Sequence, residues 1–482
     1  MLICMPRYLS RGINVLWHIR LLFRNNNTVE NVISEIVKLL FMGKEMSKPE
    51  IVVIGGGFAG LNFVKHINPD DYNVTIVDRH NYHSFPPLFY QVASAGLDPA
   101  SICFPLRREI RKLKAPNIRF RMGAVERIDV AGHCVHTADE AIPYNILVVA
   151  AGTTNNFFNM PQLEKSVYTL KSTPQALRCR NDILGLLERA SVETDATRRR
   201  KFLNFVVVGG GPTGVEIAGA IGEMKRYILL REYPSIPQNE MTITIVEGSD
   251  RLLGSMSARS SEDALKGLES LMVSVRLGET MKSFENGEVT FAGGSSIPAS
   301  MVIWTAGVTA EHFDIEGAQS NPIGHGNRLI TDGYCRVTGL SDVYAIGDVS
   351  LMPDVDSNFP KGHPQLAQVA IQQGRLLARN LNAAAKNATT GKAPELREFR
   401  YSDKGSMATI GRNRAVVDMK KAHMSGFMAW FAWMFVHLIS LLGMRNKITV
   451  LVNWIWSYFN YSTSLRLLIR PCRWPARERW DR

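Results

Sequence analysis

Two stretches of the chain share one hydrophobic pattern, in which an unbroken apolar run enters a cluster of glycines and a helix-like run leaves it. They are residues 51–60 (IVVIGGGFAG) and residues 206–221 (VVVGGGPTGVEIAGAI). Short, unbroken runs rich in β-branched residues are typical of strands buried in a parallel sheet. The pattern therefore predicts two units, each made of a strand, a glycine loop and a helix.

Both loops have the spacing Gly-x-Gly-x-x-Gly. The glycines are Gly55, Gly57 and Gly60 in the first loop, and Gly209, Gly211 and Gly214 in the second. In such a loop the first glycine permits a tight turn, the second lets the backbone approach a pyrophosphate, and the third lets the helix pack on the strand. The amides at the helix N-terminus then face the phosphates. Each loop is therefore predicted to bind a dinucleotide.

An acidic residue ends the strand that follows each loop. The strand at residues 73–77 ends at Asp78, which lies 18 residues after Gly60, and the strand at residues 242–246 ends at Glu247. A carboxylate at this position binds a ribose hydroxyl and would repel a 2′-phosphate. We therefore expect the second site to prefer NADH to NADPH.

Two dinucleotide sites on one chain are explained if one holds a flavin and the other a nicotinamide, so that hydride passes between two rings. Three later segments each lead a strand into a small-residue turn. They are residues 144–156 (YNILVVAAGTTNN), 299–308 (ASMVIWTAGV) and 342–350 (DVYAIGDVS). In this order the motifs resemble the two-dinucleotide-binding-domain flavoproteins.

That resemblance implies an α/β fold with two Rossmann-like domains and non-covalent FAD at the first loop. The residues implied for FAD are Gly55, Gly57, Phe58, Ala59, Gly60, Asp78, Arg79, Val125, Ala151, Gly152, Gly347, Asp348 and Gln368. Those implied for NADH are Gly209, Gly211, Pro212, Thr213, Gly214, Glu216, Glu247, Ala306 and Gly307. The flavin ring is expected to rest near Tyr90, Gln91 and Ala93.

The domain boundaries follow from the order of the motifs. We expect FAD-binding segments at residues 46–165 and 326–385, an inserted NADH domain at 166–325, and a membrane-anchoring segment at 386–482. Residues 1–45 are unassigned. They are Arg-rich early and contain no acid before Glu30, so they read as a targeting presequence or as an extension upstream of a true start at Met46.

The cysteines narrow the choice of electron acceptor. The six cysteines are scattered and form no Cys-x-x-Cys pair, which argues against a metal site or a disulfide-rich scaffold. Disulfide reductases and sulfide:quinone oxidoreductases of this fold need placed cysteines, and the first unit offers only Cys103. The sequence therefore disfavours both of these enzyme classes.

A glutamine-rich helix points to a quinone. In residues 363–381 (HPQLAQVAIQQGRLLARNL), Gln368, Ile371 and Gln372 share one helix face. Spacing alone also fits a solvated glutamine face. The AQxAxQQ pattern, together with residues 81–99, 214–224 and 401–418, resembles the type II NADH:quinone oxidoreductases, which reduce ubiquinone or menaquinone.

This second resemblance implies roles for several side chains. Gln368, Ile371, Gln372 and Lys404 would line the quinone pocket, and Glu216 would be the acid near nicotinamide and flavin. Glu216 is otherwise an ordinary carboxylate in the first turn of its helix, where the helix dipole favours it. Some family members carry His at the position of Ile371, and isoleucine cannot relay a proton.

The C-terminal region is strongly apolar. Residues 426–443 (GFMAWFAWMFVHLISLLG) fit a marginal transmembrane helix, a core helix, or an interfacial amphipathic anchor, and the tryptophans and nearby basic residues favour the anchor. The formal net charge is +12, and no nucleic-acid-reading motif is present. The basic residues expected to meet anionic headgroups are Lys420, Lys421, Arg445, Lys447, Arg466 and Arg470.

The expected protein is thus a membrane-peripheral enzyme that pumps no protons, since the sequence contains no bundle of membrane helices. The resemblance suggests a homodimer on the cytoplasmic face of a bacterial inner membrane, or on the mitochondrial inner membrane if residues 1–45 are a presequence. Two alternatives stay open at this point. One is a soluble reductase of a small iron–sulfur carrier, and the other is a flavin-holding scaffold without activity.

Overall fold

A computed structural model describes residues 48–390, 393–420, 422–460 and 465–468. Every element discussed below belongs to the unit formed by residues 50–482. The expectations for residues 1–45, for Lys421 and for Arg470 lie outside the described residues.

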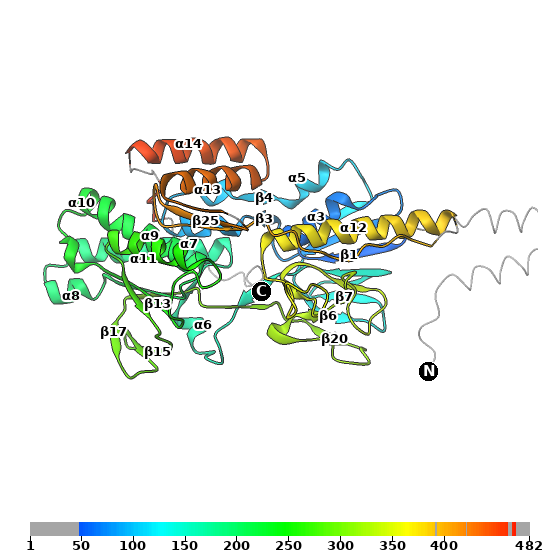
Figure 1. Cartoon of the computed structure of the whole chain (residues 1–482), viewed down its shortest axis with the longest axis horizontal. Coiled ribbons are helices and arrows are strands. Elements are labelled where there is room, and N and C mark those ends of the chain that lie inside the picture. The colour runs from blue at the N-terminus through cyan, green and yellow to red at the C-terminus, as the bar shows by residue number, and fades with distance from the viewer. Residues whose placement is uncertain (1–47, 391–392, 421, 461–464, 469–482) are drawn as a thin grey trace, which may run out of the picture. The chain divides into compact units, whose positions relative to one another are not determined.

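The first apolar stretch forms the central strand of a five-stranded parallel sheet (Figure 1). In spatial order the strands are β22 (Val343–Ala345), β9 (Ile146–Val149), β1 (Glu50–Ile54), β2 (Asn73–Asp78) and β5 (Ile118–Met122). The register of β1 on β2 runs from Glu50 opposite Asn73 to Ile54 opposite Val77. The last four residues of β1 are buried, as expected of a strand covered on both faces.

The second apolar stretch is the central strand of a second five-stranded parallel sheet. Its strands, in spatial order, are β11 (Tyr168–Thr169), β18 (Met301–Trp304), β12 (Asn204–Val208), β13 (Thr242–Glu247) and β14 (Ser274–Leu277). All five residues of β12 are buried. In sequence this sheet lies between β9 and β22 of the first sheet, and the predicted fold of two Rossmann-like units is confirmed.

Smaller elements join and flank the two sheets. A ribbon of β10 (Thr153–Asn155) and β19 (Val308–Ala310) pairs the segment after β9 with the segment after β18, so it connects the two units directly. The flanking sheets contain β20 (Asp314–Glu316), β6 (Val125–Asp129), β7 (Cys134–Thr137) and β8 (Ala141–Pro143), and β15 (Met281–Glu285), β16 (Glu288–Phe291) and β17 (Ser296–Pro298).

Each glycine loop leads into a helix, α3 (Phe58–His66) after the first and α9 (Pro212–Glu223) after the second. A π-helical turn at Met224–Ile228 and α10 (Leu229–Glu232) extend α9, which accounts for the longer spacing before Glu247. Since α9 begins at Pro212, Glu216 lies beyond its first turn, and the expectation of a first-turn position is wrong.

Helix α12 (Ala367–Thr390) packs lengthwise on α3, and the two lie side by side in Figure 1. Their close approach depends on Gly374. A Cβ at this position would collide with the Ala59 carbonyl oxygen and lie 3.1 Å from the Phe63 amide nitrogen. This crossing fixes α12, and hence its glutamines, against the helix of the first glycine loop.

The C-terminal segment forms a small antiparallel sheet and two helices. The elements are β24 (Ser406–Thr409), β25 (Ala415–Met419), β26 (Ala422–Ser425), α13 (Gly426–Ser440) and α14 (Met444–Asn460). Across the described residues, we find no helix with the length and apolar character needed to span a membrane. Ala429 and Trp433 of α13, and Val450 and Trp454 of α14, are buried.

We predict that Gly374→Ala lowers the free energy of unfolding by about 1–3 kcal/mol, because the added methyl group overpacks the crossing of α12 and α3. The matched control is Gly185→Ala in α7 (Thr173–Val192), where a Cβ would meet no atom within 4 Å. That change should instead stabilise the protein by roughly 0.5–1 kcal/mol. Urea unfolding of the two variants measures both effects, and shifts of the same sign would contradict the account.

Candidate active site

The two glycine loops have the same close-packed geometry. A Cβ on Gly60 would collide with the Gly55 carbonyl oxygen, and one on Gly214 would collide with the Gly209 carbonyl oxygen. In contrast, a Cβ on Gly57 or Gly211 would meet no protein atom within 4 Å. The second glycine of each loop therefore faces open space, as a position kept bare for a pyrophosphate requires. Both loops fit a dinucleotide.

The acid at the end of each second strand is tied to its own glycine loop. Asp78 Oδ2 accepts a 2.6 Å hydrogen bond from the Gly56 amide, and Glu247 Oε2 accepts one of 2.5 Å from the Gly210 amide. Burial raises the pKa of Asp78, while the amides of Gly56 and His80 lower it in part. These contacts hold each carboxylate at the loop, where a ribose hydroxyl of the dinucleotide would bind.

The other predicted dinucleotide residues lie around the carboxyl ends of the two sheets. Phe58 and Ala59 open α3, Val125 opens β6, and Ala151 and Gly152 follow β9, while Pro212 and Thr213 open α9 and Ala306 and Gly307 follow β18. Arg79 forms an ion pair with Glu311, with 2.8 Å between its guanidinium nitrogen and the carboxylate oxygen. This pair joins the end of β2 to the segment after β19.

Two further residues near the Gly-Asp turn were missed by sequence reasoning. The buried Gln373 accepts a 2.7 Å hydrogen bond from the Gly347 amide, and Lys171 Nζ donates to Thr153 Oγ1 at 2.6 Å. Thr153 in turn lies 3.5 Å from Asp348 Oδ2. Burial lowers the pKa of Lys171 and raises that of Asp348, and each charge offsets part of the other's shift.

Glu216 is a buried acid where the helix of the second glycine loop meets the C-terminal sheet. It is buried at 7% exposure on α9, and its Oε1 lies 3.4 Å from the Thr409 amide of β24. Burial raises the pKa of Glu216 to about 8, and the amide only partly offsets this. The nearby indole N–H of Trp433 favours the ionised form of Glu216 and so lowers its pKa slightly. Among the described residues, Trp433 Nε1 is buried and has no hydrogen-bond partner.

Tyr90 brings the first unit to the same place. It lies on α4 (Phe89–Ala93) with Gln91 and Ala93, and α4 packs against α9. Burial raises the pKa of Tyr90 well above its usual value, and a negative charge on Glu216, when that carboxyl is ionised, adds to the rise. The Tyr90 ring centroid is 6.3 Å from that of Trp433 on α13. A neutral acid and a neutral phenol therefore share a site that elements from three parts of the chain enclose.

The two predicted glutamines of α12 hold a backbone segment. Gln372 exchanges two 3.0 Å hydrogen bonds with the backbone of Ser402. Gln368 donates to the Gly405 carbonyl at 3.1 Å and accepts from the Lys404 amide at 3.2 Å. Gln368, Gln372 and Lys404 are thus brought together, with the partly buried Ile371 between the glutamines. The Lys404 side chain is exposed, and a quinone role for this group stays a prediction.

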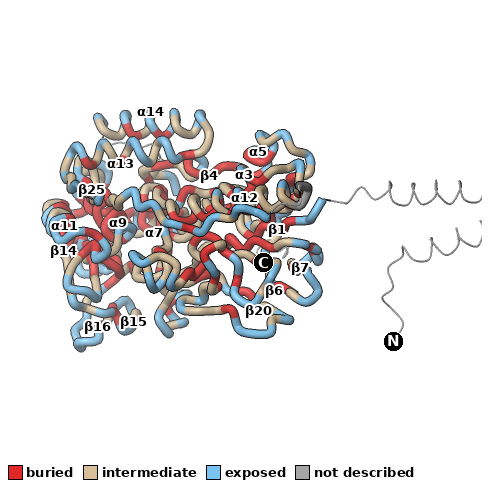
Figure 2. Tube along the Cα trace, turned by 45° about the vertical axis from the view of Figure 1, so that its right-hand side comes forward, coloured by how far each residue is buried: buried red, intermediate tan, exposed pale blue. Residues whose placement is uncertain are grey.

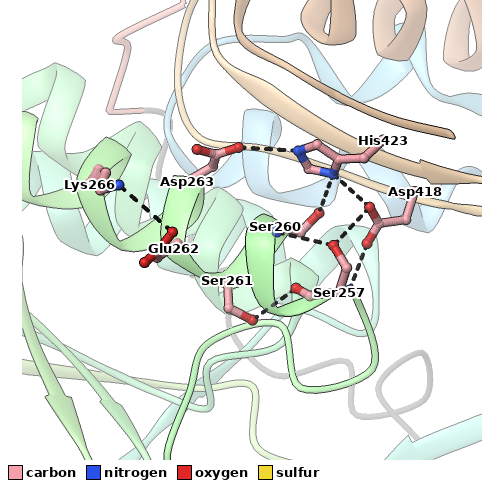
Figure 3. Close-up of polar contacts among 8 residues, drawn as sticks. All are labelled: Ser257, Ser260, Ser261, Glu262, Asp263, Lys266, Asp418 and His423. Atoms are coloured by element: carbon pink, nitrogen blue, oxygen red, sulfur yellow. Dashed lines mark hydrogen bonds and ion pairs between the residues drawn. The ribbon is translucent and has the colours of Figure 1, made fainter.

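A polar cluster fastens the C-terminal sheet to α11 (Ala258–Ser270), as Figure 3 shows. His423 Nδ1 lies 2.8 Å from Asp418 Oδ1, and its Nε2 lies 3.2 Å from Asp263 Oδ2. The Ser257 amide donates to Asp418 Oδ2 at 2.7 Å. The cluster therefore links β25 and β26 to the second dinucleotide unit.

A pocket of about 570 Å³ opens beside this cluster. It is lined by Ser255, Met256, Ser257, Asp403, Gly405, Ser406, Asp418, Met419, Lys420, Ala422 and His423. Because Asp403, Gly405 and Ser406 line it, the pocket borders the segment that the glutamines hold.

The two C-terminal helices carry many exposed large apolar side chains, which we call the apolar C-terminal surface. In Figure 2 exposed residues recur along both helices. The surface consists of Phe427, Met428, Phe431, Phe435, Val436, Ile439, Met444, Ile448, Leu451, Val452, Ile455, Trp456 and Phe459. Arg445 is exposed beside it. Arg466 does not fit the expected headgroup role, because its side chain is only 9% exposed and is ion-paired with Glu232.

Family models match most of the chain. The pyridine nucleotide-disulphide oxidoreductase model matches residues 49–374, and the NDH2 C-terminal domain model matches residues 404–460. Despite the first description, the cysteines in the described part of the chain are all free thiols, namely Cys103, Cys134, Cys179 and Cys335.

Relatives of known description cover nearly the same length. The type II NADH:quinone oxidoreductase Ndh of Mycobacterium tuberculosis is 32% identical over 416 residues, which span 84% of this chain and 87% of that protein. The internal alternative NAD(P)H-ubiquinone oxidoreductase A1 of Arabidopsis thaliana is 29% identical over 440 residues, which span 86% and 85%.

Solved structures share the fold at lower identity. NDH2 of Plasmodium falciparum in complex with NADH superposes with a TM-score of 0.78 at 21% identity, over 88% of this chain and all of that chain. The sulfide:quinone oxidoreductase of Aquifex aeolicus gives 0.64 at 17% identity, over 86% and 96%. The family resemblance seen in the sequence motifs is confirmed. The chain belongs to the type II NADH:quinone oxidoreductase family.

Proposed function

We propose that this protein oxidises NADH and reduces a membrane quinone, with FAD as its bound cofactor. The observation that carries the proposal is the packing of α4 in the first unit against α9 in the second, the helices that carry Tyr90 and Glu216. Glu216 lies on the helix that begins at the second glycine loop, and Tyr90 belongs to the first unit. If the two dinucleotides served unrelated purposes, the two units would not need to pack together around one enclosed acid.

The chain's own residues have distinct tasks in this reaction. The bare backbone at Gly57 and Gly211 leaves room for two pyrophosphates, and Asp78 and Glu247 orient the riboses. Glu247 also disfavours a 2′-phosphate and hence NADPH. When bound, FAD supplies the ability to take a hydride and pass on two electrons.

Quinone reduction needs protons as well as electrons. Reduction of a quinone to a quinol consumes two electrons and two protons, one proton at each carbonyl oxygen. With its pKa raised to about 8, Glu216 retains a proton near neutral pH and can release it into the enclosed site. We assign Gln368, Gln372 and the segment around Lys404 to the wall of the quinone pocket, in keeping with their shared position.

The apolar C-terminal surface gives the enzyme access to a lipid-soluble substrate. Exposed apolar patches of this kind mark contacts with a membrane or another protein. We infer that α13 and α14 lie in the membrane interface, with Arg445 near the headgroups. A reductase of a soluble iron–sulfur carrier would have no use for such a surface. The homodimer, the membrane face and the identity of the quinone stay predictions.

For the proton role, we predict that Glu216→Gln slows quinone-dependent reoxidation of the reduced enzyme on the order of 100-fold at pH 7. In the unmodified protein this rate should fall as pH rises through about 8, because the carboxyl then loses its proton. The variant should lack that fall. The matched control is Glu262→Gln on the exposed face of α11. A variant with the original pH profile would remove Glu216 from the mechanism.

For the membrane contact, we predict that changing Phe431 and Ile455 together to Ser lowers binding to anionic liposomes at least tenfold. Each buried large apolar side chain contributes roughly 1.5–3 kcal/mol, so the loss of two is measurable by co-sedimentation. Turnover with a water-soluble short-chain quinone in detergent should persist. Changing the exposed Val192 and Leu230 to Ser is the control. Equal liposome binding by both double variants would contradict the assignment.

A further inference from the structure

A chain of hydrogen bonds runs from the apolar C-terminal helices to the enclosed acid. Trp454 Nε1 on α14 donates to Gln91 Oε1 at 2.8 Å. Gln91 Nε2 donates in turn to the Tyr90 hydroxyl oxygen, also at 2.8 Å. Tyr90 lies on α4, which packs against α9, the helix that carries Glu216. The chain therefore connects helix α14 with the site through only three side chains.

The direction of these bonds follows from chemistry. An indole N–H can only donate, so the Gln91 carbonyl oxygen must face α14 and its NH₂ group must face Tyr90. The Tyr90 oxygen is thereby fixed as an acceptor from Gln91. Its own O–H proton must point elsewhere and is free to donate within the enclosed site. Without the indole N–H, the Gln91 amide could flip and present its oxygen to Tyr90. The Tyr90 hydroxyl would then donate its proton to Gln91 and not into the site.

A second polar contact ties helix α14 to the segment that follows α4. Asn446 Nδ2 donates to the carbonyl oxygens of Ala100 and Ser101, at 3.0 and 3.1 Å. These residues follow α4 in the chain. Trp454 is buried, at 9% exposure, whereas the next residue, Ile455, is 51% exposed. One helix thus carries both the apolar surface and the donor that orients the site.

We propose that Trp454 is a positioning residue for quinone reduction, which acts through Gln91 to keep the Tyr90 hydroxyl as a hydrogen-bond donor beside Glu216. The proposal rests on the proposed function, since it takes Glu216 and Tyr90 to face the quinone. The phenol is a suitable donor to a quinone carbonyl oxygen as negative charge develops there. The NADH half of the reaction needs no such donor.

The test uses the full-length, FAD-loaded protein and three variants. Trp454→Phe keeps an aromatic ring but removes the N–H, and Gln91→Leu removes both hydrogen bonds. Tyr458→Phe is the control on α14, where the Tyr458 ring stacks on Trp430 outside the chain of bonds. Rates of flavin bleaching by NADH and of reoxidation by a short-chain quinone are measured separately across pH, with hydrogen–deuterium exchange of the peptide that contains α4.

We expect Trp454→Phe and Gln91→Leu each to slow reoxidation by about three- to tenfold, the range for loss of one oriented hydrogen bond. The effect should fall on kcat rather than KM, and the pH profile of reoxidation should shift. The double variant should be no slower than Gln91→Leu alone, because both changes break one chain. Exchange in α4 should rise, bleaching of the Trp454→Phe variant by NADH should be unchanged, and Tyr458→Phe should match the unmodified protein.

Three results would overturn the proposal. The first is a rate of reoxidation in Trp454→Phe equal to that of the Tyr458→Phe control. The second is an additive loss of rate in the double variant. The third is an equal loss of both half-reactions in Trp454→Phe, which would mark a merely structural role for Trp454. Failure of the proposed function looks different. In that case Glu216→Gln keeps its original pH profile, or quinone does not reoxidise even the unmodified protein, whatever Trp454→Phe does.

Discussion

The burial of the Glu216 carboxyl is the interaction on which the rest of the site depends. An ionised carboxylate removed from water is costly, so a buried one keeps its proton to a higher pH. That burial is achieved only by elements that are far apart in sequence. Helix α9 supplies the residue, α4 brings Tyr90, β24 brings Thr409, and α13 brings Trp433. The raised pKa of Glu216 therefore depends on the packing of the two dinucleotide units and the C-terminal segment around it.

The glutamines of α12 take part in the same assembly. Gln368 and Gln372 hold the backbone of residues 402–405, and β24 begins directly afterwards. The far end of β24 places Thr409 over Glu216. In turn, α12 is held to the helix of the first glycine loop by the crossing at Gly374. A series of contacts therefore runs from the first glycine loop through the glutamines to the enclosed acid. The glutamine motif thus has a structural role besides any contact with quinone.

The elements that could be predicted from sequence are those with short-range signals. The glycine loops and the terminal acids have fixed spacings along a strand and a helix, and both parallel sheets follow from them. The glutamine motif was recognised by its resemblance to a family pattern, since its spacing on one helix face also fits a solvated surface. Lys171 carries no such signal, since a lone lysine is usually solvated. Gln373 closes the glutamine motif, but its bond to the Gly347 amide joins two segments that only the tertiary structure brings together. The bond between Trp454 and Gln91 joins residues 363 positions apart, a pairing that only tertiary structure reveals.

Anaerobic mixing of the purified, FAD-containing protein with its two substrates in sequence tests the central claim most directly. The account predicts that NADH bleaches the flavin absorbance, that NADPH does so far more slowly, and that a short-chain ubiquinone or menaquinone analogue restores the absorbance at a rate that matches turnover. Bleaching by NADH without restoration by either quinone would contradict the account, because it would leave two working dinucleotide sites with no quinone reaction.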